Sequence, residues 1–186
     1  MTYTIKVAGL ERDLPICRLN DDLMIAGFVI FGDVELTVAC ARELIKKAPD
    51  YDYIVCPEAK AIPLAHEIAR QSGRNDYFVV RKAAKAYMRG VFSVEDVSIT
   101  TKGKQTLYMD GADAEKLKGK RVLILDDVIS TGGSLKAVEH LVNEAGGIIV
   151  GRMAILAEGA AYKRDDIIVL EPLPLFNGKG EPLPID

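Results

Sequence analysis

Short apolar runs alternate with amphipathic stretches over most of the chain, and the two patterns have different periods. Apolar runs bounded by polar residues are typical of strands covered on both faces, and they occupy residues 53–56, 77–80, 122–125, 147–156 and 167–170. Stretches with helical spacing accompany them at residues 34–48, 64–72 and 134–145. Strands that alternate with helices favour an α/β fold built on a parallel sheet.

Local signals define the first of these helices. Asp33 stands where an N-cap is needed, immediately before the helical pattern begins. The predicted apolar face of this helix consists of Val34, Val38, Ala41 and Ile45. We expect that face to pack against the sheet.

Two parts of the chain lack the alternation. Residues 1–30 are predicted to be irregular, although they contain apolar clusters at residues 5–10 and 24–31. Residues 82–120 are rich in charged and small polar side chains and show no sustained period. Because a long irregular stretch in a compact domain is usually functional, we expect a flexible flap that contains a hairpin with arms at residues 92–100 and 105–109.

Composition bounds the class of protein. A chain of 186 residues is long enough for one domain with a full core, and its net charge of −3 gives no basic field that would attract nucleic acid. No apolar run is long enough to span a membrane, and the first residues lack the pattern of a signal peptide. The cysteines Cys17, Cys40 and Cys56 are too few for a disulfide framework or a zinc site, which predicts a reduced, cytoplasmic setting.

The most informative segment follows the strand at residues 122–125. Two adjacent acids, Asp126 and Asp127, come at its carboxyl end, where ligands of open α/β sheets bind. Paired carboxylates can accept hydrogen bonds from two neighbouring sugar hydroxyls or help to hold a hydrated Mg²⁺. After Val128 and Ile129 comes a loop of small residues suited to an anion, because its backbone N–H groups and hydroxyls can surround a phosphate at the start of the next helix: Ser130, Thr131, Gly132, Gly133 and Ser134.

Two further segments place cations at the same edge of the sheet. The turn after the strand at residues 53–56 contains Glu58, Ala59, Lys60 and Ala61, whose small residues allow close backbone approach to an anion. The next strand ends in a basic cluster formed by Arg81, Lys82 and Lys85. Such cations suit a diphosphate, and arginine can contact it in a bidentate manner.

Together these segments resemble the type I phosphoribosyltransferases, purine branch. The resemblance rests on PEAKAIPLA, FVVRKAAK, TLYMDG and RVLILDDVISTGGS, within residues 51–157. It implies a Rossmann-like parallel sheet with the acids at the end of its third core strand, a flap at residues 82–120, and a small hood from residues 1–32 and 158–186. It also implies that Asp126 and Asp127 hold the ribose hydroxyls of phosphoribosyl pyrophosphate (PRPP) and that residues 130–134 hold its 5′-phosphate.

The same resemblance implies the rest of the site. Lys60, Arg81 and Lys85 are expected at the pyrophosphate, with a cis peptide at Ala59–Lys60 or a neighbouring bond. Mg²⁺ is expected to be held chiefly through PRPP, with Asp126 or Asp127 as contacts through water. The flap departs from the adenine enzymes, because residues 98–103 read SITTKG, and Glu95 is the nearest substitute for their catalytic glutamate.

The expected reaction is purine salvage, in which PRPP and a purine base, adenine in the first instance, give the nucleoside monophosphate and pyrophosphate. Phe28 and Val29, together with residues 170–176, are candidates for the base pocket. Hypoxanthine, guanine or xanthine are alternative bases, orotate is a more distant one, and a PRPP-sensing regulator without catalysis is a different class. Family members are commonly dimers, so we expect a homodimer.

Overall fold

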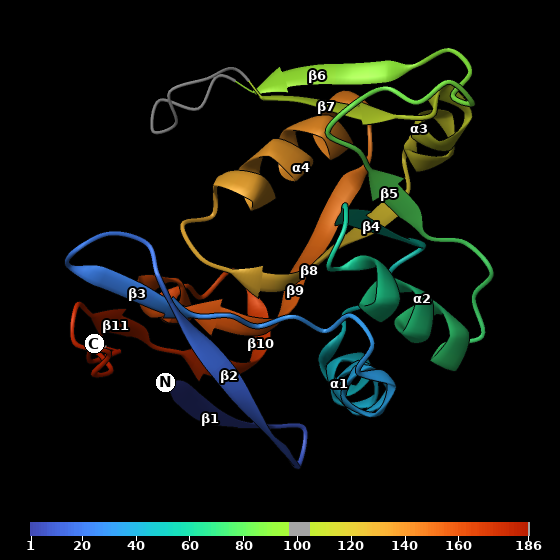
Figure 1. Ribbon diagram of the computed structural model, residues 1–186. Helices are drawn as coiled ribbons and strands as arrows, with labels where there is room; N and C mark the ends of the chain where they lie inside the picture. Colours follow the sequence, from blue (N-terminus) through green and yellow to red (C-terminus); the bar gives the residue numbers. More distant parts are fainter. Residues whose placement is uncertain (97–104, 186) are drawn as a thin grey trace.

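A computed structural model describes residues 1–96 and 105–185. Its centre is a parallel sheet with the strand order β10-β9-β8-β4-β5 (Figure 1). The strands are β4 Tyr53–Pro57, β5 Phe78–Val80, β8 Arg121–Ile129, β9 Ile148–Glu158 and β10 Ile168–Leu173. Every strand predicted for the parallel sheet is confirmed, and so is the α/β class.

The middle strand, β8, is longer than predicted. Residues 122–125 are at most 1% exposed, as expected for a strand covered on both faces. β8 then continues past the acids to Ile129, because it pairs with β9 at Val128↔Leu156 and Ile129↔Ala157. Asp126 and Asp127 therefore belong to the strand itself, and its ladder fixes their backbone.

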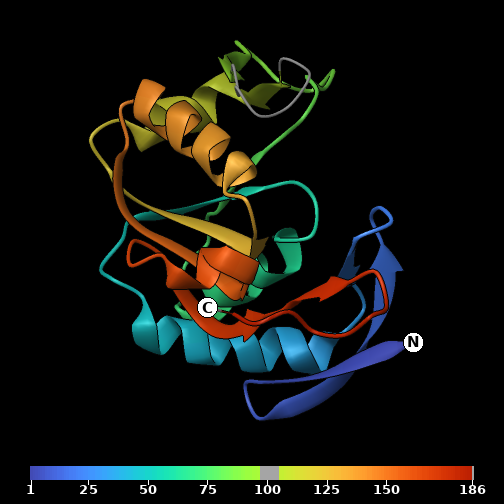
Figure 2. The same cartoon turned by 90° about the vertical axis from the view of Figure 1, so that its left-hand side faces the viewer.

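Helices cover both faces of the sheet. On one face α1 and α2 pack against β4, β9 and β10; on the other, α4 lies between the sheet and a hairpin (Figures 1 and 2). The helices are α1 Val34–Lys47, α2 Ile62–Gln71, α3 Gly111–Leu117, α4 Gly133–Glu144 and the 3-10 helix η1 Gly159–Lys163. The predicted helices at residues 34–48, 64–72 and 134–145 are confirmed.

The N-cap of α1 is confirmed, but its predicted apolar face is only partly right, because Ala41 is buried and Ile45 packs against the core whereas Val34 faces solvent. The Asp33 side chain accepts a hydrogen bond from the Leu36 N–H at 3.0 Å. The buried face consists of Leu36, Thr37, Cys40, Ala41 and Leu44, whereas Val34 is 72% exposed. The helix has apolar residues on two adjoining stripes, and its contacts with α2 and the sheet decide which stripe is buried.

The prediction that residues 1–30 are irregular is also wrong. They form three strands that join β11 Leu175–Asn177 in an antiparallel sheet of order β1-β2-β3-β11; the three are β1 Thr2–Val7, β2 Leu10–Arg18 and β3 Leu23–Ala26. Ala8 and Gly9 connect the first two with positive φ angles of 51° and 81°, as in a type I′ hairpin turn. An Ala-Gly turn is a weak signal for a hairpin, and charged residues obscure the alternation of β2, although that of β1 is regular at Tyr3, Ile5 and Val7. This hood sheet joins the two segments from which a hood was expected.

Residues 82–120 are more ordered than their composition indicates. The expected hairpin is present as β6 Phe92–Asp96 and β7 Gln105–Met109, while residues 97–104 lie outside the described residues. Helix α3, which we did not predict, follows it and is capped by Asp110. Leu107, Met109 and Leu117 are at most 4% exposed, so this segment contributes to the core beneath α4.

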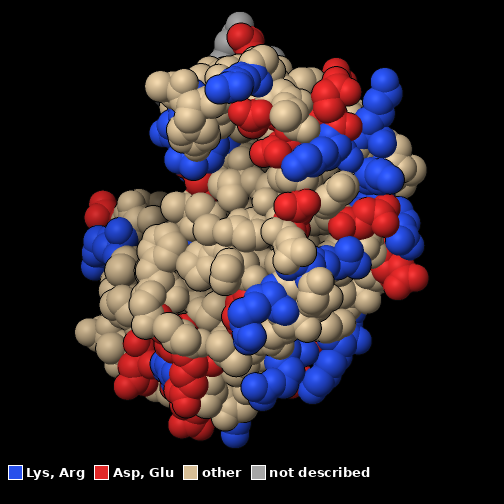
Figure 3. Space-filling model, turned by 90° about the vertical axis from the view of Figure 1, so that its right-hand side faces the viewer, with Lys and Arg blue, Asp and Glu red and all other residues tan. Residues whose placement is uncertain are grey.

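Two observations concern the surface. Among the described helices, none combines the length and the apolar character needed to cross a bilayer. On the face shown in Figure 3, Lys, Arg, Asp and Glu side chains of both signs surround a largely uncharged middle.

Candidate active site

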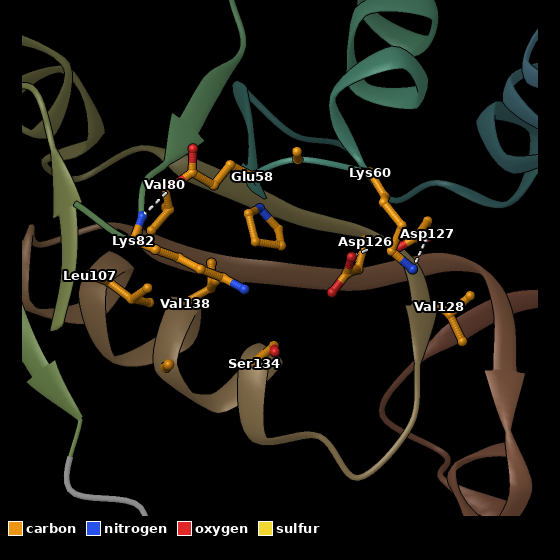
Figure 4. Close-up of a pocket in the computed structure, with 13 residues that line it drawn as sticks. Glu58, Lys60, Val80, Lys82, Leu107, Asp126, Asp127, Val128, Ser134 and Val138 are labelled. Atoms are coloured by element: carbon orange, nitrogen blue, oxygen red, sulfur yellow. Dashed lines mark hydrogen bonds and ion pairs between the residues drawn. The ribbon is translucent and has the colours of Figure 1, made fainter. Parts of the chain in front are cut away.

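A polar cavity of about 170 Å³ lies at the carboxyl edge of the parallel sheet (Figure 4). Five elements or their ends contribute its walls: β4, β5, β7, β8 and α4. The lining residues are Pro57, Glu58, Ala59, Lys60, Val80, Lys82, Leu107, Asp126, Asp127, Val128, Ser134, Ala137 and Val138. Segments that are distant in sequence are thus brought together where ligands of open α/β sheets bind.

The two acids point in different directions within this cavity. Successive side chains of a strand face opposite sides of the sheet, so Asp127 points toward Lys60 and Asp126 away from it (Figure 4). Asp127 is 3% exposed. Its backbone N–H donates to Oδ1 of Asp126 at 2.9 Å, which fixes the orientation of the first carboxyl group.

The pKa of the Asp126 carboxyl group lies near neutral pH. Burial, and then the negative charge of Asp127, raise the pKa of Asp126 from 3.8 to about 7, and the positive charge of Lys60 opposes them. A carboxyl group with such a pKa changes charge in the range where an enzyme works.

An ion pair closes one wall of the cavity. Nζ of Lys60 lies 2.8 Å from Oδ2 of Asp127, and the two side chains are 46% and 5% exposed. Within the described part of the chain, no other donor makes a hydrogen bond to this buried oxygen. Lys60 therefore compensates the charge of Asp127.

The turn between β4 and α2 is tied to the end of β5. Oε1 of Glu58 accepts a hydrogen bond from the Lys82 N–H at 2.6 Å, and its Oε2 lies 2.6 Å from Nε of Arg81. The Lys82 N–H and then the charge of Arg81 lower the pKa of Glu58, against the effect of burial. The Lys82 side chain extends into the cavity (Figure 4). The expected cis peptide is confirmed at a neighbouring bond, Glu58–Ala59.

A second, smaller cavity of about 50 Å³ adjoins the first. The predicted phosphate loop surrounds it, and the lining residues are Asp126, Val128, Ile129, Ser130, Thr131, Gly132, Gly133, Ser134 and Leu135. Asp126, Val128 and Ser134 line both cavities, so the two lie side by side. Gly132 has a φ of 81° and caps α4, an arrangement that leads the N-terminus of the helix to the small cavity.

Several predicted residues lie outside the lining of these cavities. Arg81 is engaged by Glu58 and by the Tyr87 hydroxyl, which it approaches at 3.2 Å. Ala61 is 1% exposed and packs in the core. Lys85 acts on the site as one of the charges that lower the pKa of Glu58. Their contacts with a ligand stay predictions.

The expected catalytic and base-binding residues are more distant. Glu95 lies in β6 opposite Thr106, outside the lining of either cavity, and its catalytic role stays a prediction. Phe28 is 4% exposed and packs in the core, whereas Val29 is 56% exposed. The role of these two residues in binding a base stays a prediction.

Some lining residues and neighbours escaped the sequence analysis. Leu107 reaches the cavity from the hairpin, and Val138 reaches it from α4. Glu158 ends β9, and burial raises its pKa while the nearby charge of Lys60 opposes that change. The rule that identified the acids of β8, polar groups at the carboxyl ends of parallel strands, could have found Glu158 as well.

Comparisons with known proteins agree with this arrangement. A family model described as "Phosphoribosyl transferase domain" matches residues 33–184. A hypoxanthine/guanine phosphoribosyltransferase of Methanocella paludicola is 33% identical over 127 residues, which cover 68% of this chain and 61% of the relative. An adenine phosphoribosyltransferase of Fervidobacterium nodosum is 38% identical over 101 residues, which cover 54% of this chain and 56% of the relative.

Solved structures give the same result for the fold. The adenine phosphoribosyltransferase of Thermoanaerobacter pseudethanolicus superposes with a TM-score of 0.63 at 26% identity, covering 77% of this chain and 84% of that one. An enzyme of Giardia lamblia with the same name, solved with 9-deazaadenine, gives 0.62 at 20% identity and covers 92% and 93% of the two chains. Because the family model covers most of the sequence, including every segment that lines the cavities, this chain belongs to the phosphoribosyl transferase domain family.

Proposed function

We propose that this protein transfers the 5-phosphoribosyl group from PRPP to a purine base and releases pyrophosphate, with adenine as the base and AMP as the product. One observation carries the proposal: Asp126 of β8 lines both the cavity at the predicted phosphate loop and the larger cavity that Lys60 and Lys82 also line. Each chemical part of PRPP thus has a complementary surface in these two adjoining cavities.

The order of these surfaces matches the order of groups in PRPP. The 5′-phosphate would occupy the small cavity at the N-terminus of α4, where backbone N–H groups and hydroxyls converge. The ribose hydroxyls would then lie at Asp126 and Asp127. The diphosphate would extend toward the turn at Lys60 and the side chain of Lys82.

In this reaction a purine nitrogen forms a bond to C1 of the ribose while the bond from C1 to the diphosphate oxygen breaks. Positive charge develops on the sugar, and negative charge leaves with the diphosphate. Carboxylates at Asp126 and Asp127 would favour the first charge, and Lys82 would favour the second. Positioning and electrostatics therefore account for the role of the protein.

Magnesium fits this site as a companion of the substrate. Two carboxylates supply oxygen ligands of the kind that Mg²⁺ prefers, but two residues leave most of its coordination to phosphate oxygens and water. We propose that the ion arrives with PRPP and that Asp126 or Asp127 contacts it through water. It would neutralise charge on the departing diphosphate.

Pyrophosphate release tests the proposal directly. The protein would be mixed with PRPP, Mg²⁺ and one base at a time: adenine, hypoxanthine, guanine, xanthine or orotate. The substitution Asp127→Asn should lower kcat by at least about tenfold, because it removes a charge that favours the transition state. Asp21→Asn, at an exposed acid of the hood, is the matched control. Equal kcat for the two variants would remove Asp127 from the mechanism.

A second base has specific support. The relative from Methanocella paludicola is a hypoxanthine/guanine phosphoribosyltransferase, and its similarity extends over more residues of this chain than that of the Fervidobacterium nodosum enzyme. Turnover with hypoxanthine or guanine but not adenine would establish that alternative. PRPP binding without turnover of any base would instead indicate a regulator.

A homodimer also stays part of the proposal. Light scattering coupled to size-exclusion chromatography would measure the molar mass in solution and so the oligomeric state.

A further inference from the structure

The phosphate loop has an arginine directly against its central glycine. Gly132 adopts a φ of +81°, and a Cβ atom built on it would lie 2.8 Å from Nη1 of Arg164. The guanidinium group thus occupies the space that any side chain at position 132 would need. Arg164 directly follows η1, a part of the chain that is distant from the loop in sequence.

The direction of this guanidinium group is set by an acid two residues away. Nε of Arg164 donates to Oδ1 of Asp166 at 2.8 Å, and Nη2 donates to Oδ2 at 2.7 Å. This bidentate fork uses one edge of the planar group and turns Nη1 toward the loop. No acceptor in the described ranges, 1–96 and 105–185, takes a hydrogen bond from Nη1. The Arg164 side chain is only 28% exposed.

Asp166 is itself held by the elements around the loop. Nε of Arg152, in β9, lies 3.9 Å from Oδ2 of Asp166 and also forms an ion pair with Glu139. Glu139 belongs to α4, the helix that begins immediately after Gly132. Ion pairs thus connect α4 with the loop that precedes it, in the order Glu139, Arg152, Asp166 and Arg164.

The phosphate loop lacks a cation of its own. Its own donors are backbone N–H groups and the hydroxyls of Ser130, Thr131 and Ser134, while the carboxyl group of Asp126 stands at the edge of the same small cavity. A phosphate monoester brings almost two negative charges at neutral pH. A fixed guanidinium group behind the loop would offset that charge without contacting the ligand.

We propose that Arg164 is a positioning residue for the phosphate end of the substrate: it supports the backbone of the loop at Gly132 and supplies positive charge behind it. This inference rests on the proposed function, because it takes the 5′-phosphate of a sugar as the occupant of the loop. Asp166 is the residue that aims Arg164.

Ligand binding by the full chain tests the electrostatic part. Calorimetry would measure ribose 5-phosphate and pyrophosphate separately for the wild type, Arg164→Met and Arg164→Lys. We expect Arg164→Met to weaken ribose 5-phosphate binding by about tenfold and to leave pyrophosphate binding within about twofold. The affinity of Arg164→Lys for ribose 5-phosphate should fall between those of the wild type and Arg164→Met, because lysine restores the charge but not the bidentate fork with Asp166. Lys163→Met removes the same charge from the neighbouring exposed residue and should match the wild type.

The outcomes separate this inference from the proposed function. A wild type that binds neither ribose 5-phosphate nor PRPP would overturn both. Binding by the wild type with an unchanged dissociation constant in Arg164→Met would overturn the role of Arg164 alone. Equal weakening of both ligands would also overturn it, because that result would indicate a general structural defect.

A double-mutant cycle tests the contact without any ligand. Gly132→Ala would be introduced into the wild type and into Arg164→Ala, and urea midpoints would be compared. The strain of a positive φ is the same in both backgrounds, so the cycle isolates the clash with the guanidinium group. We expect a smaller loss of stability in the Arg164→Ala background. Equal losses would show that Arg164 does not limit the space at Gly132.

Discussion

Removing the amine of Lys60 should destabilise the protein by leaving a buried carboxylate without its partner. The change is Lys60→Met, which keeps the length of the side chain and deletes its charge. Loss of one partner of a buried ion pair costs about 3 to 5 kcal/mol. Because the Lys60 side chain is 46% exposed, water can reach this pair and we expect about 1 to 3 kcal/mol.

The assay is urea unfolding of each variant at pH 8, read as the free energy of unfolding. The double variant Lys60→Met/Asp127→Asn removes both charges and should recover more than half of the loss. Lys82→Met is the matched control, because it deletes a lysine of the same cavity whose ammonium group forms no ion pair within the described residues. It should change the free energy of unfolding by less than about 0.5 kcal/mol.

The same variant, Lys60→Met, should also change the pKa of Asp126. The charge of Lys60 lowers the pKa of Asp126 against burial and the charge of Asp127, so Lys60→Met should move that pKa further upward. Nuclear magnetic resonance of the carboxyl carbon would measure the shift. A Lys60→Met protein as stable as the wild type, or a double variant no more stable than the single one, would refute the inference that Lys60 compensates Asp127.

Two further predictions concern the acid of β8 and the start of α1. Because the pKa of Asp126 is raised to about 7, the folded state binds a proton more tightly than the unfolded state between about pH 4 and 7, and stability should fall as pH rises through that window. The free energy of unfolding of Asp126→Asn, relative to that of the wild type, should therefore rise by about 2 to 4 kcal/mol between pH 4 and 8. Urea unfolding at several pH values would measure this difference, and a difference that does not change with pH would contradict the raised pKa. Asp33→Ala should cost about 1 to 3 kcal/mol, since Asp33 caps α1 and pairs with Arg12 at 2.6 Å. Asp22→Ala, at an exposed acid, is its control, and equal stability of the two variants would exclude the cap.

The sequence by itself determined the order of elements in the core and the identity of the central motif. The strands and helices of the parallel sheet follow from apolar periodicity, which depends only on residues close in the chain. The segment from residue 122 to residue 134 contains a buried strand, two acids, a glycine turn and a helix start in direct succession. The position of the two acids beside a loop of small residues was therefore predictable, because one short segment builds both.

The sequence failed where local signals were weak or ambiguous. The strands of the hood were missed because an Ala-Gly turn is not a typical hairpin signal and charged residues interrupt the alternation of β2, although that of β1 is regular. Helix α3 was missed because it is short and lies within a charged segment. For α1 the element and its cap were right but the buried stripe was only partly right, because packing selects one of two adjoining apolar stripes.

Only the tertiary structure decided which distant residues meet. Three contacts join segments from different parts of the chain: Lys60 with Asp127, Leu107 with the cavity, and Arg164 with Gly132. Their spacing in the sequence contains no information about distance in space, because the order of strands in the sheet and the connections between them determine it. The motif therefore predicts the kind of ligand, whereas the fold determines which charges surround the cavity.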